Sequence, residues 1–400
     1  KFYNSLTPNK KFSNVEIINT SKNNNKIINF TISFYKFFIK TFIVVLLSKL
    51  IGKNLVKSFK NACLSLYPIF YLNQNEKFFN EKFLKLNFLI TDESHLNNTF
   101  FQNIKKLFVT RNIDNLIIVE KYIFLNYLII FFFKSLIILS KFEKINKISF
   151  FFNELDLTKI INDYTSASIF NAIKLQIYRN QLKKIFIKYN IENFHYFMFE
   201  YNFGFFLSNN IKKSLSSVQL IGYQHGIFSE KLMWLDLFKD NNKNLKIFPD
   251  QIVVNYKFCL DSYKKIFKGI KIMVSDKLRK NININISNKN KYKNKILVLL
   301  GLHDSIDTIH KITEITETKK NLLFYLKFHP KSKIKLKSIN KNISIISDFK
   351  KTKFGSIILS QSSTLIYDML INKLPFKLLR INNRPSLFPY TVKHKMKYIN

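Results

Sequence analysis

GSIILSQSSTLIYDMLINKLPFKLL, residues 355–379, is the segment whose pattern most clearly indicates the fold. It opens with a short apolar run that is typical of a buried strand, and SSTLIYDMLIN (362–372) then has helical spacing. PFKLLRI (375–381) follows as another strand. A strand, a helix and a strand in this order predict a parallel sheet with helices on its faces.

The same alternation extends towards the N-terminus. We predict strands at KILVLLG (295–301), LLFYLKFHP (322–330) and ISIIS (343–347), with an amphipathic helix at 304–316. These segments predict a C-terminal Rossmann-like domain over residues 295–400.

A second set of alternating segments precedes it. The expected strands are 147–152, 194–200, 218–226 and 251–255, and the expected helices are 168–189, 205–215 and 258–267. They predict an N-terminal Rossmann-like domain over 147–280. The polar segment 281–294 reads as a linker, so the expected fold class is α/β, with two Rossmann-like domains that face a cleft.

Residues 1–146 are expected to form an extra apolar N-terminal region that is partly helical. Its stretches 30–52 and 122–140 are long and apolar, but lysines interrupt both, so neither is a clean membrane span. For 30–52 two interpretations stay open: a basic, aromatic helix in the membrane interface, or a helix of a Phe-rich core. For 122–140 we favour the core.

Composition limits the class of protein. Of 400 residues, 47% are hydrophobic, which excludes a disordered chain. The net charge of +40 suits an anionic partner, but the lysines are spread along the chain without an Arg-rich arm, so we expect no nucleic acid. Cys63 and Cys259 are the only cysteines, which fits a reducing cytoplasm and gives no disulfide framework or zinc site.

The hydroxyl cluster Ser362, Ser363 and Thr364 opens the expected helix after the strand at 355–360. Hydroxyls and free N–H groups at a helix N-terminus can bind a phosphate, although one of these serines could equally be an ordinary N-cap. Asp368 lies about one turn further on, where it could reach a ribose or sugar hydroxyl.

Two further features join this candidate phosphate site. KFHP (327–330) places His329 after a strand, and parallel strands would bring it to the same sheet edge as the Ser-Ser-Thr turn. Lys327 could add charge, although it points to the opposite side if the strand is still extended there. Gly301 follows the first strand of this domain, where a glycine lets a helix N-terminus approach a phosphate.

GYQHG (222–226) ends a strand of the other domain and carries His225. Glu200 ends the strand before it. A carboxylate beside a histidine at a cleft forms a candidate general base and its partner, while a loop histidine bonded to the backbone is the structural alternative.

These motifs carry a resemblance to a known family. KFHP and ILSQSSTLIYDMLINKLPFKLL resemble the motifs of two-domain glycosyltransferases of the GT-B type, including bacterial capsule sialyltransferases and CDP-glycerol glycerophosphotransferases. The segment that holds EYNFG and GYQHG is similar to surface carbohydrate biosynthesis proteins of O-antigen and capsule clusters. Two departures are that Phe328 replaces a more usual proline, and that the second acid of the family is missing near Phe205.

The resemblance, over residues 147–385, implies an enzyme that transfers a sugar from a nucleotide-activated donor to a surface polysaccharide precursor. It implies that His329 and the Ser362–Thr364 hydroxyls hold the donor phosphates, and that Glu200 and His225 act as catalytic residues. We expect no metal and no cofactor. The expected partners are a nucleotide sugar, a glycan or lipid-linked glycan, and an anionic membrane surface.

Two alternatives remain: a non-catalytic scaffold of glycan assembly with the same fold, and a basic nucleic-acid-binding protein, which charge alone supports. For the leading hypothesis we expect a cytoplasmic protein, peripheral to the inner face of the cytoplasmic membrane.

Overall fold

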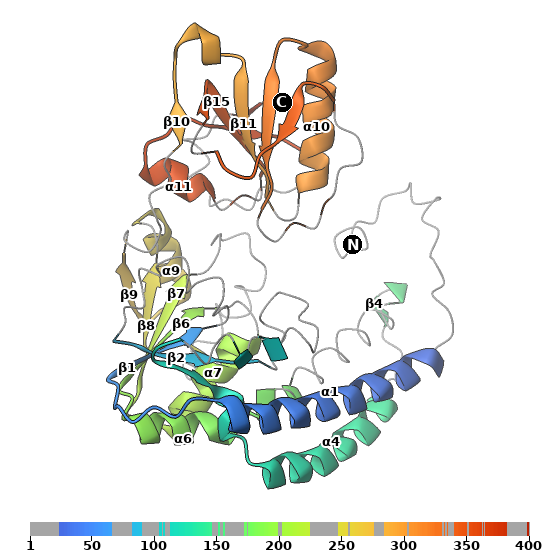
Figure 1. Ribbon diagram of the computed structural model, residues 1–400, viewed down its shortest axis with the longest axis vertical. Coiled ribbons are helices and arrows are strands. Elements are labelled where there is room, and N and C mark those ends of the chain that lie inside the picture. The colour runs from blue at the N-terminus through green and yellow to red at the C-terminus, as the bar shows by residue number, and fades with distance from the viewer. Residues whose placement is uncertain are drawn as a thin grey trace.

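Two parallel β-sheets organise the chain, one built from its first part and one from its last, as the computed structural model shows (Figure 1). The structure describes residues 24–65, 82–89, 104–105, 107–108, 113–145, 151–152, 155–156, 172–173, 175–198, 202–224, 247–254, 257–275, 284–301, 304–329, 332, 334, 340–349, 352–361, 363, 365–381 and 398–399.

The first sheet has seven strands in the order β3-β2-β1-β6-β7-β8-β9, and all its pairings are parallel. Its strands are β1 (Asn61–Ser65), β2 (Leu84–Asn87), β3 (Leu116–Ile118), β6 (Asn193–Met198), β7 (Gln219–Gln224), β8 (Gln251–Val254) and β9 (Lys271–Val274). Taken in chain order, its first six strands have the 3-2-1-4-5-6 arrangement of the Rossmann fold.

The second sheet has six strands in the order β13-β12-β11-β15-β16-β17, again all parallel. Its strands are β11 (Lys295–Leu299), β12 (Leu323–Lys327), β13 (Ile343–Ile345), β15 (Ser356–Leu359), β16 (Lys377–Leu379) and β17 (Tyr398–Ile399). This is the complete 3-2-1-4-5-6 order. The predicted α/β class with two Rossmann-like sheets is therefore confirmed.

Helices cover both faces of the second sheet, which explains why its central strand is apolar throughout. Val298 packs in one cluster with Ile312 of α10 (Ser305–Thr318). Leu297 packs in another cluster with Ile366 of α11 (Leu365–Ile371). Because successive side chains of a strand point to opposite faces, an uninterrupted apolar run such as KILVL fills both interfaces.

The helices of the first unit are α1 (Asn24–Ile51), η2 (Val119–Tyr122), α4 (Leu125–Ile145), α6 (Arg179–Tyr189), α7 (Asn202–Ser214), η5 (Lys257–Cys259) and α9 (Leu260–Ile266). The long helices α1 and α4 run side by side at one end of the molecule (Figure 1). Their buried sides join the core of the first sheet through Phe34, Phe38 and Phe131. No helix among the described residues is long and apolar enough to cross a membrane.

The structure changes the expected division of the chain at residue 147. Strands β1, β2 and β3 come from the region 1–146, yet they belong to the same sheet as β6 to β9. The region 1–146 is therefore not an addition to the first sheet but supplies three of its strands. These strands were not predicted, because they have only three to five residues, too few to show a clear period.

Two short pairs of strands lie outside the main sheets. The expected strand at 147–152 is described only at β4 (Phe151–Phe152), which pairs antiparallel with β5 (Leu155–Asp156). In the expected linker 281–294, β10 (Asn285–Ile286) pairs with β14 (Lys353–Phe354), and η7 (Asn290–Tyr292) follows it. This linker is therefore attached to the second unit.

Glu120 ties the N-terminal strands to the rest of the first unit. Its side chain is fully buried, and Oε1 accepts hydrogen bonds from the Leu89 backbone N–H at 2.6 Å and from the Tyr178 hydroxyl at 2.5 Å. A buried carboxylate needs such donors to offset its lost hydration. These bonds join the end of β3 to the loop after β2 and to the start of α6.

One apolar cluster spans the two units. It contains Ile252 of β8 and Tyr263 of α9, together with Leu297 of β11 and Leu359 of β15. The two sheets therefore share part of their core.

Candidate functional site

The order in which strands are added to the second sheet reverses between β11 and β15. From β11 the chain proceeds outward to β12 and β13, and it then returns to place β15 on the other side of β11. Open α/β sheets bind ligands outside the carboxyl ends of the strands at this kind of switch point. The register aligns Lys327 and Leu359 with Leu299, so β12, β11 and β15 end at the same level.

At this switch point a serine joins the two central loops. The Gly301 backbone N–H donates to Ser360 Oγ at 2.6 Å, and the Ser360 N–H donates to the Leu299 carbonyl at 3.2 Å. The Ser305 hydroxyl donates to the Gly301 carbonyl. Gly301 was predicted to let a helix N-terminus approach a phosphate, and this stays a prediction. Its hydrogen bonds to Ser360 and Ser305 connect the loop after β11 to the residue after β15 and to the start of α10.

Next to this bond lie two buried polar side chains, those of Gln361 and Ser363, which are only 6% and 4% exposed. The Ser363 N–H donates to the Ser360 carbonyl at 3.2 Å. Within the part of the chain that the structure describes, Gln361 Oε1 has no hydrogen-bond partner. Buried polar atoms are nearly always paired, so an unpaired amide oxygen beside a switch point needs an explanation, and a bound ligand group would supply one. We call Gly301, Ser360, Gln361 and Ser363 the switch-point cluster.

Sequence reasoning included Ser363 but missed Ser360 and Gln361. The available signal was their position, because polar residues directly after a buried strand lie at the carboxyl edge of the sheet. The other two predicted hydroxyls, Ser362 and Thr364, lie outside the described residues. Helix α11 begins at Leu365, one residue after the last of these hydroxyls.

Asp368 is the fourth residue of α11, as expected, but it is buried, with 3% of its surface exposed. Its backbone carbonyl accepts hydrogen bonds from the Asn372 N–H at 3.0 Å and from Asn372 Nδ2 at 2.7 Å. Its depth in the core indicates that a sugar hydroxyl would need a path past neighbouring side chains to reach it.

His329 follows β12 by two residues and is half-buried. Its carbonyl accepts a hydrogen bond from the Ser332 N–H at 2.8 Å, which closes a turn. The prediction that KFHP and the Ser-Ser-Thr turn come to one sheet edge is confirmed at the level of the strands. Only β11 separates β12 from β15, so the two strand ends are about 10 Å apart.

Lys327 points away from the switch point. Its ammonium group donates to the Ser347 carbonyl, just past the end of β13, and β13 lies on the far side of β12 from β11. The expectation that Lys327 faces the opposite side of an extended strand stays a prediction. Arg380, which sequence reasoning did not include, is exposed directly after β16, the neighbour of β15, and it adds a cation to this edge.

The two predicted catalytic residues, Glu200 and His225, lie outside the described residues. Each follows closely on a described strand end, Met198 of β6 and Gln224 of β7, and these two strand ends are aligned in the register of the sheet. Across the described ranges, no three His, Cys, Asp or Glu side chains come together in a group that could hold a metal ion.

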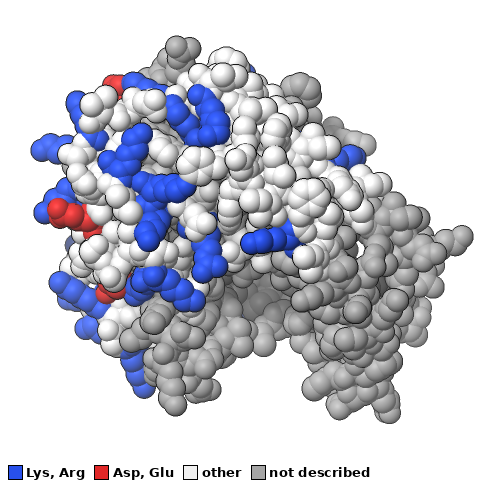
Figure 2. All heavy atoms as spheres, turned by 90° about the horizontal axis from the view of Figure 1, so that it is seen from below, with Lys and Arg blue, Asp and Glu red and all other residues white. Residues whose placement is uncertain are grey.

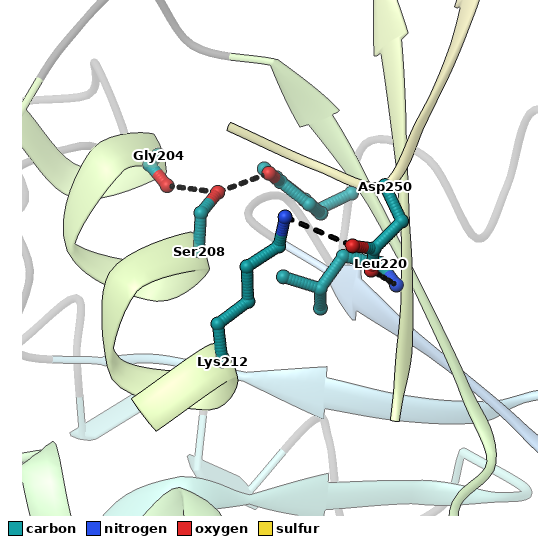
Figure 3. A network of polar contacts seen from close by, with 6 residues as sticks. Gly204, Ser208, Lys212, Leu220 and Asp250 are labelled. Atoms are coloured by element: carbon teal, nitrogen blue, oxygen red, sulfur yellow. Dashed lines mark hydrogen bonds and ion pairs between the residues drawn. The ribbon is translucent and has the colours of Figure 1, made fainter. Parts of the chain in front are cut away.

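Helix α7, which follows Glu200 in the chain, is fixed to the sheet by a polar network (Figure 3). Ser208 Oγ donates to the Gly204 carbonyl at 3.0 Å and shares a hydrogen bond with the buried Tyr196 hydroxyl of β6. Burial raises the pKa of Tyr196 above its ordinary value, so this hydroxyl stays protonated. The network holds the first turns of α7 against the strand that precedes Glu200.

The last turn of α7 is held in the same way (Figure 3). Lys212 Nζ lies 2.9 Å from Asp250 Oδ1, and Asp250 Oδ2 accepts a hydrogen bond from the Leu220 backbone N–H at 2.8 Å. Asp250 precedes β8 and Leu220 lies near the start of β7, so this contact is at the amino edge of the sheet, opposite the carboxyl edge. Its role is therefore structural.

His195 was set aside in the sequence because nothing converged on it. It is the third residue of β6, is 8% exposed, and has Nδ1 2.9 Å from the Tyr223 hydroxyl. Burial lowers the pKa of His195 to about 4 and raises the pKa of Tyr223 to about 12. Both groups are therefore neutral near pH 7, and their contact is an ordinary hydrogen bond within the strand layer.

No protein-family model matches the chain, and no curated protein matches its sequence. Among solved structures, the chain is similar to the glycotransferase of kitacinnamycin, with a TM-score of 0.44 and 11% identity over 86% of this chain and 87% of that one. For the UDP-N-acetylglucosamine 2-epimerase from Rickettsia bellii the TM-score is 0.42, with 10% identity over 82% and 80%.

The N-terminal domain of Candida albicans trehalose-6-phosphate phosphatase gives a TM-score of 0.43, with 12% identity over 87% of each chain. TM-scores this low carry no argument of their own. The fold assignment rests on the strand order of the two sheets.

Proposed function

We propose that the chain is a glycosyltransferase that transfers a sugar from a nucleotide-activated donor to a surface polysaccharide precursor of the O-antigen or capsule type. The switch-point cluster is the observation that carries this proposal, because Gln361 Oε1 is buried there without a described partner. The Lys-x-His-Pro and Ser-Ser-Thr motifs support a donor with phosphates; of their described residues, His329 follows β12 and Ser363 belongs to this cluster.

The proposed donor site uses this edge of the second sheet. The hydroxyls of Ser362, Ser363 and Thr364 and the imidazole of His329 donate hydrogen bonds to the donor phosphates. Fixed donors of this kind stabilise the negative charge that develops on a leaving phosphate, and the reaction then needs no metal. Gln361 accepts a hydrogen bond from a donor group, such as an N–H of the base or a sugar hydroxyl.

The proposed transfer breaks the bond between the anomeric carbon and the phosphate oxygen. A bond forms between that carbon and the acceptor hydroxyl oxygen, and the hydroxyl proton passes to Glu200 or His225. The nucleoside diphosphate or monophosphate leaves with the bonding electrons. The acceptor is a glycan or a lipid-linked glycan, which places the enzyme at the inner face of the cytoplasmic membrane.

Calorimetric titration with a panel of nucleotide sugars tests the donor site. We expect His329→Ala and Ser363→Ala each to weaken binding by about tenfold, because each removes a charge-assisted hydrogen bond. The matched controls are His310→Ala and Ser344→Ala, which are exposed in the same unit and lie away from the switch point. Unchanged affinity in both site variants would overturn the assignment.

One observation favours a second candidate, a non-catalytic scaffold of glycan assembly. Where the resembling family has a second acid, this chain has Phe205 and Phe206, and both pack against apolar clusters. An apolar side chain cannot transfer a proton. Product formation from any nucleotide sugar would exclude the scaffold, whereas donor binding without turnover by the wild-type protein would favour it.

A further inference from the structure

Helix α1 exposes an apolar stripe along its length. Its exposed apolar residues recur every three or four positions, which places them on one side of a helix. They are Ile32, Tyr35, Ile39, Phe42, Leu46 and Leu50. The exposed fraction reaches 61% at Ile39 and 81% at Leu50, so this side of α1 is uncovered among the described residues.

Helix α4 exposes a matching stripe, although the sequence favoured burial of this segment. Its exposed apolar residues are Ile129, Ile130, Phe133 and Ile137, with 60% of Phe133 exposed. The two helices are in contact: the Phe38 and Phe132 rings lie 5.1 Å apart, and the Tyr35 and Phe132 rings lie 5.8 Å apart. We call the two exposed stripes together the docking face.

Large exposed apolar patches on a single protein usually mark a binding surface. Here the patch combines two long helices that lie side by side at one end of the molecule (Figure 1). Neither helix is long and apolar enough to cross a membrane. A helix with such a stripe can instead lie in the plane of a membrane interface.

Positive charge borders the docking face. Lys36, Lys40 and Lys49 lie along α1, and Lys134 lies on α4. All four lysines are exposed. Figure 2 looks onto this end of the molecule and shows blue cationic side chains beside a large uncharged area, with few acidic side chains. The sequence of α1 contains no acidic residue.

A second cationic group surrounds the exposed Phe124 at the start of α4. Lys184 of α6 lies 3.6 Å from the centre of the Phe124 ring, and Lys49 lies 5.8 Å from it. Nearby, burial lowers the pKa of Lys121, and the charges of Lys188 and Lys49 lower it further. Cations held this close repel one another, and an anionic surface would relieve that repulsion.

We propose that the docking face binds flat to the surface of an anionic phospholipid bilayer. The apolar stripes of α1 and α4 enter the interface, and the bordering lysines contact the anionic headgroups. Lysine-rich borders favour lipid over protein, because protein interfaces are depleted in lysine. This inference rests on the helix pair and is independent of the proposed transferase activity.

Flotation of the purified full chain with vesicles tests the proposal. We use phosphatidylcholine vesicles with about one third phosphatidylglycerol, and pure phosphatidylcholine vesicles for comparison. We expect binding to the anionic vesicles that weakens at about 0.5 M salt, because lysine contacts to headgroups are screened. The double variant Ile39→Glu, Phe133→Glu should lower the partition coefficient at least about tenfold, because each glutamate enters the apolar stripe.

The matched control is Ile306→Glu on α10, which is 55% exposed on the second unit and should bind like the wild type. A second series of variants removes charge from α1. Lys36→Gln and Lys40→Gln should lower binding by about fivefold for each lysine removed. The exposed pair Lys319→Gln, Lys320→Gln should have little effect.

Three results would overturn the proposal. The first is no binding of the wild type to anionic vesicles, and the second is equal binding by the double variant. The third is a wild-type dimer that becomes a monomer in the double variant, which would make a second copy of the chain the occupant. Donor titration without vesicles should be unchanged in the docking variants, so failure here and failure of the proposed function are distinguishable.

Discussion

The two sheets share one strand order but differ in what surrounds them. In the second sheet, α10 and α11 cover the faces and the polar features gather at the carboxyl edge, around Gly301 and Ser360. The first sheet carries an additional pair of long helices, α1 and α4, whose outer sides are apolar. Two sheets of one strand order can therefore present different surfaces, because the helices packed outside each sheet determine which apolar side chains stay exposed.

The largest expected effect tests whether the two sheets unfold together. Phe194→Ala in β6 and Phe324→Ala in β12 each remove a fully buried ring, which should lower the free energy of unfolding by about 3–5 kcal/mol. Because one apolar cluster joins β8 to β11 and β15, both variants should shift the same urea transition, followed by circular dichroism. Two transitions, each moved by only one variant, would show that the sheets are independent.

The next expected effect is a pH dependence of stability that comes from His195 in the first sheet. His195 has a folded pKa of about 4, against about 6.5 when unfolded. Between these values the unfolded chain binds a proton that the folded chain does not, so stability falls as the pH drops from 6.5 to 4, by up to about 3 kcal/mol. His195→Gln should flatten the dependence of the urea midpoint on pH over this range.

The control for this effect is His310→Gln on the exposed side of α10 in the second unit, which should keep the wild-type profile. An unaltered profile in His195→Gln would contradict the assignment of the acid sensitivity to the first sheet.

The next two variants have smaller expected effects. In each sheet one of them removes a side-chain oxygen that accepts a hydrogen bond from a backbone N–H group. Asp250→Ala leaves the Leu220 N–H without its acceptor, and Ser360→Ala does the same for Gly301. Each should cost about 1–2 kcal/mol of unfolding free energy. Only Ser360→Ala should also weaken nucleotide-sugar binding, because only this bond lies at the proposed donor site. Equal binding losses in the two variants would indicate a general structural effect.

The smallest effects concern ion pairs. The Lys212–Asp250 pair is partly buried, whereas Lys311 pairs with Glu314 at 3.1 Å on the exposed side of α10. Lys212→Met should cost about 0.5–1 kcal/mol, and Lys311→Met only about 0.3 kcal/mol, because solvent screens the exposed pair. Chemical denaturation in low and high salt measures both, and a larger loss for Lys311→Met would reverse the expected order.

Much of the second sheet could be predicted from the sequence. Strands such as KILVL and SIIL are continuous apolar runs, and the helices between them have clear periodicity. The Ser363 position followed from the same pattern. The orientation of Lys327 and the bond between Gly301 and Ser360 depend on neighbours that lie far apart in the sequence, which a local pattern does not reveal.

The first sheet was predicted only from β6 to β8. The short strand LII (116–118) has too few residues to show a period, and its burial comes from contacts with segments far along the chain. Residues 122–140 were predicted to lie in the core because of their apolar composition. An apolar composition does not say which side of a helix is covered, and α4 has only one side packed against its neighbours.

Local periodicity was enough to predict the α/β class, the two sets of alternating elements and the place of Ser363 shortly after the strand at 356–359. Only the tertiary structure decided that the first three strands join the first sheet, that Gln361 is buried beside the switch point, and that α1 and α4 share an apolar outer face. Each of these depends on which distant segments pack together, and burial is a property of that packing.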